Sequence, residues 1–99
     1  MIARQWRGLA KEEHAALYTE HLRFETIPML QAIPGFISAS ILRRAVPQAV
    51  KFLVITHWVS LEAIRAFAGD NVEAAVVPQN VREMMLDYDQ TVRHYEVVV

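Results

Sequence analysis

The strongest strand signal in the chain is the run Val50-Lys51-Phe52-Leu53-Val54-Ile55-Thr56-His57-Trp58-Val59. Alternate side chains of an extended strand point to opposite faces of its sheet. One face of this run therefore carries Phe52, Val54, Thr56 and Trp58, and the other carries Leu53, Ile55, His57 and Val59. Because both faces are rich in large side chains, the sequence predicts a strand that is covered on both sides.

Turn and helix signals place three elements before this strand. A short strand over residues 1–9 precedes a helix over residues 11–33, which Pro28 is expected to kink or end near Thr26. The pair Pro34-Gly35 stops the helix. Residues 36–44 form the next expected strand, and a polar turn over residues 43–48 leads out of it. Simple alternation in that strand groups Ile37, Ala39 and Ile41 on one face and Phe36, Ser38, Ser40 and Leu42 on the other.

Further signals follow the central strand. Ser60 is a typical N-cap, and Gly69 is a typical residue just beyond a helix end, so a helix is expected between them. Residues 71–77 are ambiguous. Pro78 suits the first turn of a helical piece running to about residue 86, and residues 89–99, rich in Val and Tyr, are expected to form the last strand.

The order β-α-β-β-α-β predicts an α+β, ferredoxin-like fold over a single domain, residues 1–99. Both helices then cover one face of a four-stranded antiparallel sheet. A second copy of the sheet, packed about a two-fold axis, is the simplest cover for the other face. Apolar residues make up 54% of the chain, against about 45–50% in ordinary globular proteins. We therefore expect a homodimer that forms a dimeric α/β barrel.

Charge and residue content exclude several classes of protein. Ten Lys and Arg against eleven Asp and Glu give a net charge of −1, which argues against a nucleic-acid partner. The absence of cysteine excludes disulfides, thiolate metal sites and Cys nucleophiles. The opening residues lack the apolar core of a signal peptide, and prolines interrupt the longest uncharged run, residues 26–42. We expect a cytoplasmic protein with no membrane partner.

Four segments resemble the antibiotic biosynthesis monooxygenase-like family of dimeric α/β barrels. They are Ala3-Arg4-Gln5-Trp6-Arg7-Gly8, Ile33-Pro34-Gly35-Phe36, the run from Phe52 through Trp58 to Ala63, and Val92-Arg93-His94-Tyr95-Glu96-Val97. The resemblance extends over the whole chain and implies the ferredoxin-like dimer. Family members include cofactor-independent oxygenases of anthrones and quinols and also haem-degrading enzymes. Trp58 occupies the family's Trp position after the third strand, which implies that it lines the pocket.

The haem-degrading branch of the family is the less similar one. It uses an Asn on the first strand and a Trp–His pair around the second helix. Here the first strand offers Arg4 and Gln5, the position nine residues after Trp58 is Phe67, and residues 68–77 contain no His. The resemblance therefore implies a cofactor-independent oxygenase, in which the substrate supplies the electrons and the protein binds and deprotonates an aromatic ring.

His21 is the candidate catalytic residue. At helical spacing, Tyr18, His21 and Glu25 share one face, and a His beside a carboxylate is a suitable general base for a phenolic proton. The alternative is a helix face at the solvent boundary, with polar tips exposed. No metal site is expected, because His14 and His21 lie about 10 Å apart along the helix.

Aromatic side chains are the candidate substrate-binding residues: Trp6, Tyr18, Trp58 and Phe67. Together with Phe24 they could line a cleft between sheet and helices, or they could form an ordinary core, an interpretation that applies best to Phe24 and Phe67. By alternation His57 faces away from Trp58, which suits a core or interface His.

Three functions remain open on this evidence. The first is a cofactor-free monooxygenase acting on a small aromatic or quinol-like substrate, with His21 as base. The second is a non-catalytic small-molecule-binding or stress-related dimer. The third is a purely structural dimer whose cleft is filled by its own side chains. An open cleft reached by His21 or Tyr18 favours the first two.

Overall fold

The computed structural model describes all residues, 1–99, and shows an α+β fold built on an antiparallel sheet. In chain order the main elements are β1 (Ile2–Lys11), α1 (Ala15–His21), α2 (Ile27–Gln31), β2 (Phe36–Val46), β3 (Ala49–Trp58), α3 (Leu61–Ala68), α4 (Gln79–Met84), β4 (Met85–Tyr88) and β5 (Arg93–Glu96). The expected ferredoxin-like fold is confirmed.

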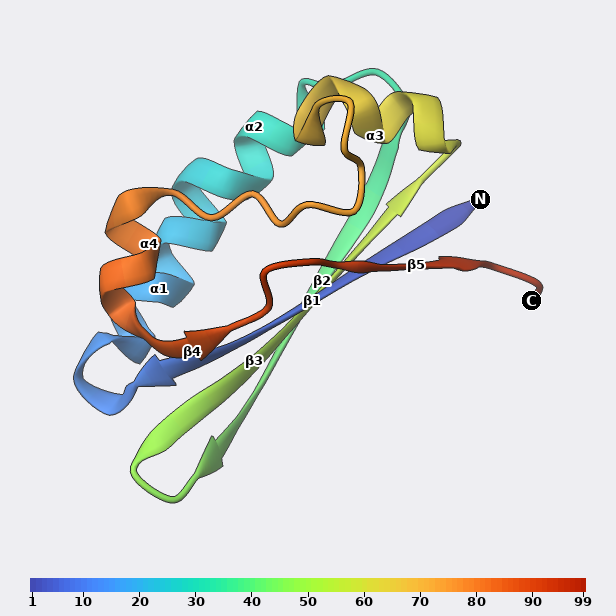
Figure 1. The fold of residues 1–99 in the computed structure, drawn as a ribbon. Helices are drawn as coiled ribbons and strands as arrows, with labels where there is room; N and C mark the ends of the chain where they lie inside the picture. The colour runs from blue at the N-terminus through green and yellow to red at the C-terminus, as the bar shows by residue number, and fades with distance from the viewer.

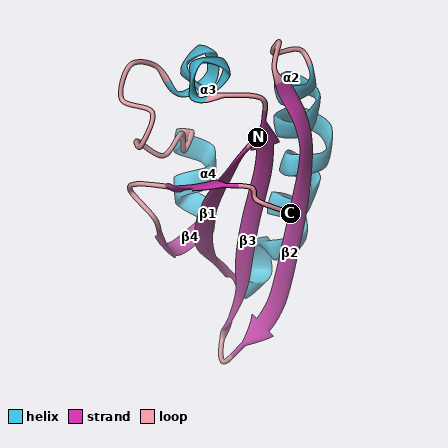
Figure 2. Cartoon of the chain, turned by 90° about the vertical axis from the view of Figure 1, so that its right-hand side faces the viewer, coloured by secondary structure: helices cyan, strands magenta, loops and turns pink.

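The sheet has the strand order β2-β3-β1-β4. Strands β4 and β5 pair with the same edge of β1, β4 near its C-terminal end and β5 near its N-terminal end. All the helices lie on one side of it, as Figure 1 and Figure 2 show. On β3, Phe52, Thr56 and Trp58 are buried beneath the helices, as the alternation predicts. Leu53 and Ile55 point to the opposite face and are half-buried.

A β-bulge at the start of β2 overturns one sequence expectation. The register between β2 and β3 shifts between Phe36 and Ser38, so Phe36 lies opposite Trp58. Its ring meets that of Trp58 edge-on, with centroids 5.3 Å apart. The expectation that Phe36 shares a face with Ser38 was wrong, because the extra residue, Ile37, reverses the alternation at this end of the strand.

The expected long helix is present as a composite. A 3₁₀ turn (Glu12–His14) leads into α1, and a five-residue π-helix (Leu22–Thr26) joins α1 to α2. Pro28 lies at the start of α2, but the π segment runs directly into this helix, so its missing N–H and its ring fall inside a continuous helical run. The disturbance near Thr26 is therefore a π segment that leaves the helix continuous.

The C-terminal expectations were partly wrong. Helix α4 ends at Met84, earlier than expected, and the last strand is divided into β4 and β5. Between β4 and β5 the chain leaves the sheet at Asp89. The backbone carbonyl of Asp89 accepts a hydrogen bond from Trp6 Nε1 at 3.0 Å, and the side-chain carboxylate of Asp89 accepts one from the Arg7 backbone N–H at 3.0 Å. Residues 90–92 then pair with residues 73–75 of the loop between α3 and α4.

Helix α3 has the ends that the sequence predicts. Ser60 Oγ accepts a hydrogen bond from the Ala63 N–H at 3.3 Å, and Gly69 at the other end has φ of 82°. The turn before β2 also needs its glycine: Gly35 has φ of 93°, and a Cβ there would lie 2.5 Å from the Cβ of Ala63. The glycine therefore allows α3 to pack closely against the start of β2.

Two apolar clusters fill the space between helices and sheet. The larger one gathers around Trp6, Tyr18 and Phe52, and the smaller one consists of Leu30, Trp58 and Ile64 with its half-buried neighbours. Phe67 belongs to the edge of the smaller cluster. A cavity lies between these two clusters.

Candidate functional site

A cavity of about 80 Å³ lies between the sheet and the helices and is lined mostly by apolar side chains. Its polar contributors are Arg4, Tyr18, His21, Thr26 and Thr56. The apolar ones are Trp6, Leu22, Leu30, Val54, Phe67, Val76, Val77, Pro78, Val81 and Val92. The lining therefore comes from both apolar clusters and from β1, β3, the long helix, α3 and the C-terminal third of the chain.

Four of the five site residues expected from the sequence meet at this cavity: Trp6, Tyr18, His21 and Phe67. Trp58 does not line it. Its side chain is fully buried, and its ring stacks behind that of Phe67, with centroids 6.1 Å apart. The Nε1–H of Trp58 donates a hydrogen bond of 2.8 Å to Thr56 Oγ1. Trp58 thus supports two lining residues from behind.

His21 sits at the edge of the cavity with its carboxylate partner. Its side chain is 11% exposed, and Nδ1 lies 2.9 Å from Oε2 of Glu25, which is 69% exposed. The helical spacing predicted this pair. A proton on Nδ1, donated to the carboxylate, leaves the Nε2 lone pair as the basic site of the neutral ring. The His21 ring also stacks on Tyr18, with an interplanar angle of 16°.

Tyr18 is the most deeply buried polar lining residue, with 3% of its surface exposed. Its ring packs edge-on against Phe52, with centroids 4.8 Å apart. Burial raises the pKa of its phenol far above the ordinary value, so the group stays protonated. No hydrogen bond within the chain involves its hydroxyl, which leaves both a donor and an acceptor beside the cavity.

Arg4 is the functional candidate that sequence reasoning missed. The side chain is only 5% exposed and lies on β1, two residues before Trp6 and on the same face. Its guanidinium donates to the carbonyls of Val72 and Ala74, and to Nε2 of His94 at 3.0 Å. Alternation along β1 puts Arg4 on the same face as the buried Trp6 and Ala10, and a charged residue in that position was the available signal.

The partners of Arg4 are all neutral. Because guanidinium groups only donate, Nε2 of His94 accepts, and that ring is the neutral Nδ1–H tautomer. Phe67 lies against the guanidinium, with Cζ of Arg4 5.6 Å from the ring centroid. Burial lowers the pKa of Arg4 to about 10, so the group is charged at neutral pH.

We expect His94 to titrate below its ordinary pKa of about 6.5. Burial and the positive charge of Arg4 lower its pKa, and Glu73 acts in the opposite direction. As the pH drops below 6.5, His94 becomes protonated in the unfolded chain but stays neutral in the folded chain. The free energy of unfolding therefore falls as the pH drops toward the pKa of His94 in the folded protein. An NMR titration of the His94 ring and urea unfolding at pH 7.5 and 5.5 measure both effects. In the variant His94→Gln the pH dependence of unfolding should be smaller, and an equal dependence contradicts the assignment.

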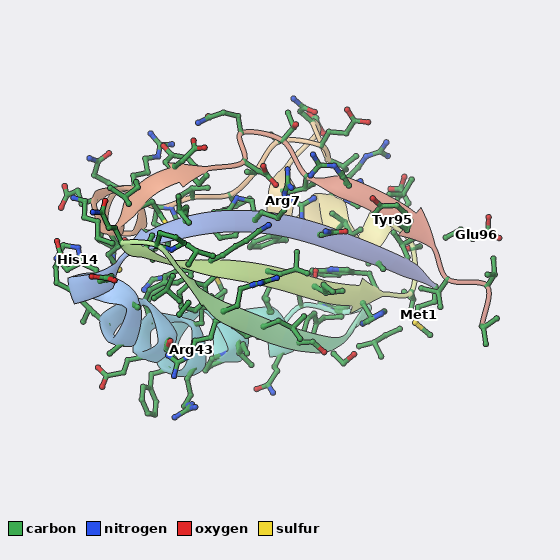
Figure 3. The ribbon with its side chains drawn as sticks, turned by 90° about the horizontal axis from the view of Figure 1, so that it is seen from below. Met1, Arg7, His14, Arg43, Tyr95 and Glu96 are labelled. Carbon is green, nitrogen blue, oxygen red and sulfur yellow. The ribbon has the colours of Figure 1, made fainter.

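Several other candidates lie away from the cavity. Phe24 is 68% exposed, so it belongs neither to a core nor to a cleft, and both expectations for it were wrong. His57 lies on the sheet face opposite Trp58, with Nδ1 3.4 Å from Ser38 Oγ. His14 lies at the end of the molecule away from Met1 and Glu96, as Figure 3 shows. No group of three or more metal-ligating side chains is close enough to hold an ion, and no helix has the length and apolarity needed to cross a membrane.

Comparison with known proteins gives a consistent family signal. The family model for antibiotic biosynthesis monooxygenases matches residues 1–76. A solved structure of an antibiotic biosynthesis monooxygenase superposes with a TM-score of 0.71 at 14% identity, with both chains covered completely. A protein from Bacillus cereus assigned to the same group gives 0.66 at 19% identity, over 99% of this chain and 93% of that one.

The haem-degrader MhuD from Mycobacterium tuberculosis, solved with two haems bound, also has this fold. Its TM-score is 0.60 at 21% identity, over 98% of this chain and 96% of that one. At such identities these structures establish the fold alone. The search of curated proteins finds no match.

Proposed function

Because the chain belongs to the antibiotic biosynthesis monooxygenase family, we propose that it is a cofactor-independent monooxygenase acting on a small aromatic, quinol-like substrate. The cavity between the sheet and the helices would hold the ring. The observation that carries the proposal is the pair of His21 and Glu25 at the edge of a mostly apolar cavity. A base with an orienting carboxylate is what removal of a phenolic proton requires.

The chemistry needs little from the protein beyond binding and proton transfer. His21 Nε2 accepts the phenolic proton, and the resulting phenolate is electron-rich enough to reduce O₂. One oxygen atom enters the ring, the other leaves as water, and the substrate supplies all the electrons as the quinol becomes a hydroxyquinone. The apolar walls, including Trp6 and Phe67, would keep water from the reduced-oxygen intermediate. Protonated Tyr18 would offer a hydrogen bond to a ring oxygen.

Cavity size favours a small ring over a tetrapyrrole. Pockets for drug-sized ligands usually measure about 300–1,000 Å³. The cavity here, about 80 Å³, is smaller even than the ~150 Å³ engineered cavity that admits benzene. A single ring would therefore project partly through the mouth. The alternative function is a non-catalytic protein that binds a small metabolite in the same cavity.

Aerobic turnover separates the two functions. The purified protein would be incubated with a panel of hydroquinones and naphthoquinols in air, without any added cofactor, while O₂ uptake and products are followed. The proposal expects one equivalent of O₂ consumed per hydroxyquinone formed, with one ¹⁸O atom from ¹⁸O₂ in each product. Binding of the panel without O₂ uptake above the rate of autoxidation favours the metabolite-binding alternative.

We also propose that two copies of the chain pack through the sheet face that the helices leave uncovered. This face carries Leu9, Leu42, Leu53 and Ile55, all half-buried or exposed in the single chain. A stable interface would bury roughly 1,600 Å² in total. We expect the mass of a dimer by light scattering at micromolar concentration.

A charged side chain introduced on this face should dissociate the dimer, because the interface would bury the charge without a partner of opposite sign. Ile55→Lys is therefore expected to give a monomer. Leu17→Lys is the matched control, since Leu17 is 50% exposed on α1, on the helix side. A wild-type monomer, or a dimer that survives Ile55→Lys, contradicts this prediction.

A further inference from the structure

Arg4 has hydrogen-bonding capacity that the chain does not use. A guanidinium carries five N–H bonds. Three of those in Arg4 have acceptors, namely two loop carbonyls and Nε2 of His94. No acceptor in the chain meets the Nε–H or the second N–H of Nη2. Since Arg4 lines the cavity, we take these two donors to be available to a ligand bound there.

The positive charge of Arg4 also lacks a counter-ion. None of its partners carries a negative charge, and no salt bridge in the protein includes it. Glu73, the carboxylate that acts on His94, is exposed and does not pair with Arg4. A charge on a buried side chain without an opposite charge is costly, and an anion bound beside it would remove much of that cost.

The rest of the cavity suits a ligand with one charged end. No Asp or Glu lines it. The nearby lining is aromatic and aliphatic, with Phe67 against the guanidinium and Trp6 two residues along the same strand. Tyr18, a buried residue whose hydroxyl has no hydrogen-bond partner in the chain, supplies a further donor at the same cavity.

We propose that Arg4 forms a subsite for an anionic oxygen of a small aromatic ligand, either a carboxylate that the ligand carries or a phenolate. The planar fork of a guanidinium matches two oxygens of a carboxylate or one phenolate oxygen between its donors. The carboxylate case stands independently, whereas the phenolate case rests on the function proposed above, in which His21 generates that ion.

Matched ligand pairs test the subsite in the wild-type protein without any turnover. Benzoate against benzamide tests the carboxylate, and ionised 4-nitrophenol against 4-nitroanisole tests the phenolate. Binding would be measured by NMR, together with the ¹⁵N-detected Nε–H signal of Arg4. In at least one pair the anion should bind about tenfold or more tightly than its neutral analogue and should shift that signal, because charge-assisted hydrogen bonds are the stronger kind.

Variants assign the preference to this side chain. Arg4→Met should abolish the anion preference, whereas Arg44→Met, the same change at an exposed position of β2, should leave it intact. If Arg4→Met fails to fold, the Nε–H signal in the wild-type protein decides the question. Equal binding within both pairs, no binding of any of the four ligands, or a preference that survives Arg4→Met overturns the subsite. Benzoate binding at Arg4 in a protein that consumes no O₂ overturns the proposed function and leaves the subsite standing.

Discussion

His21→Ala should lower the rate of quinol oxidation about 10²–10⁴-fold while the protein stays folded. The variant removes the only His that lines the cavity. The exposed carboxylate of Glu25, which pairs with that His, remains without its partner. The loss should be in kcat, because the ring of the substrate still fits and only the proton acceptor is missing. It would be measured as the initial rate of O₂ uptake at saturating substrate, with the circular dichroism spectrum as the check on folding.

A pH profile distinguishes a base from a structural residue. If His21 accepts the proton, kcat for the wild type falls on the acid side as the ring becomes protonated, and the variant loses this dependence. His14→Ala is the matched control, since His14 belongs to the same composite helix but lies outside the cavity lining. Its ring Nδ1 is buried without a partner, so no hydrogen bond is lost. Undiminished activity in His21→Ala, or an equal loss in His14→Ala, contradicts the role of His21 as base.

Trp58→Ala should lower the free energy of unfolding by about 3–5 kcal/mol. The indole is fully buried between Phe36 and Phe67, and truncation would leave a large void and remove its hydrogen bond to Thr56. For a domain of this size that is a large part of a typical total of 5–15 kcal/mol. We expect a fall of roughly 12 °C or more in Tm, measured by calorimetry.

Phe24→Ala provides the comparison for that loss. Phe24 is an aromatic residue of similar bulk that is 68% exposed, so its truncation should cost little stability. Equal stability of Trp58→Ala and the wild type would contradict the packing of β3 described above. A loss of ligand binding in Trp58→Ala at temperatures where it remains folded would show that the indole also shapes the cavity through Thr56 and Phe67.

The sequence predicted most of the fold because local signals and tertiary packing agree there. The alternation in residues 50–59 marked the central strand and the face of Trp58 correctly. Ser60, Gly35 and Gly69 marked turns and caps whose geometry requires those residue types. The His21–Glu25 pair followed from helical spacing alone, since residues four apart are neighbours on a helix surface.

The errors arose where distant contacts decide the local structure. The bulge at Ile37 changes the face of Phe36 with no local signal of its own. The break in the last strand depends on Arg7, which is far from Asp89 in sequence, and on the loop at residues 73–75, which lies outside the strand itself. Arg4 was missed as a site residue because its partners, including His94, lie about 70–90 residues away.

The cavity wall is built from two stretches of the chain, one inside the segment that the family model matches and one beyond it. His21, Trp6 and Arg4 belong to the segment that the family model matches, whereas Val77, Val81 and Val92 lie beyond it. Part of the shape of the cavity is therefore set by a stretch of sequence that carries none of the candidate catalytic residues. Exchange of the valines near the C-terminus would widen or narrow the cavity and leave His21, the proposed base, unaltered. Such a separation gives one scaffold a simple route to many substrates.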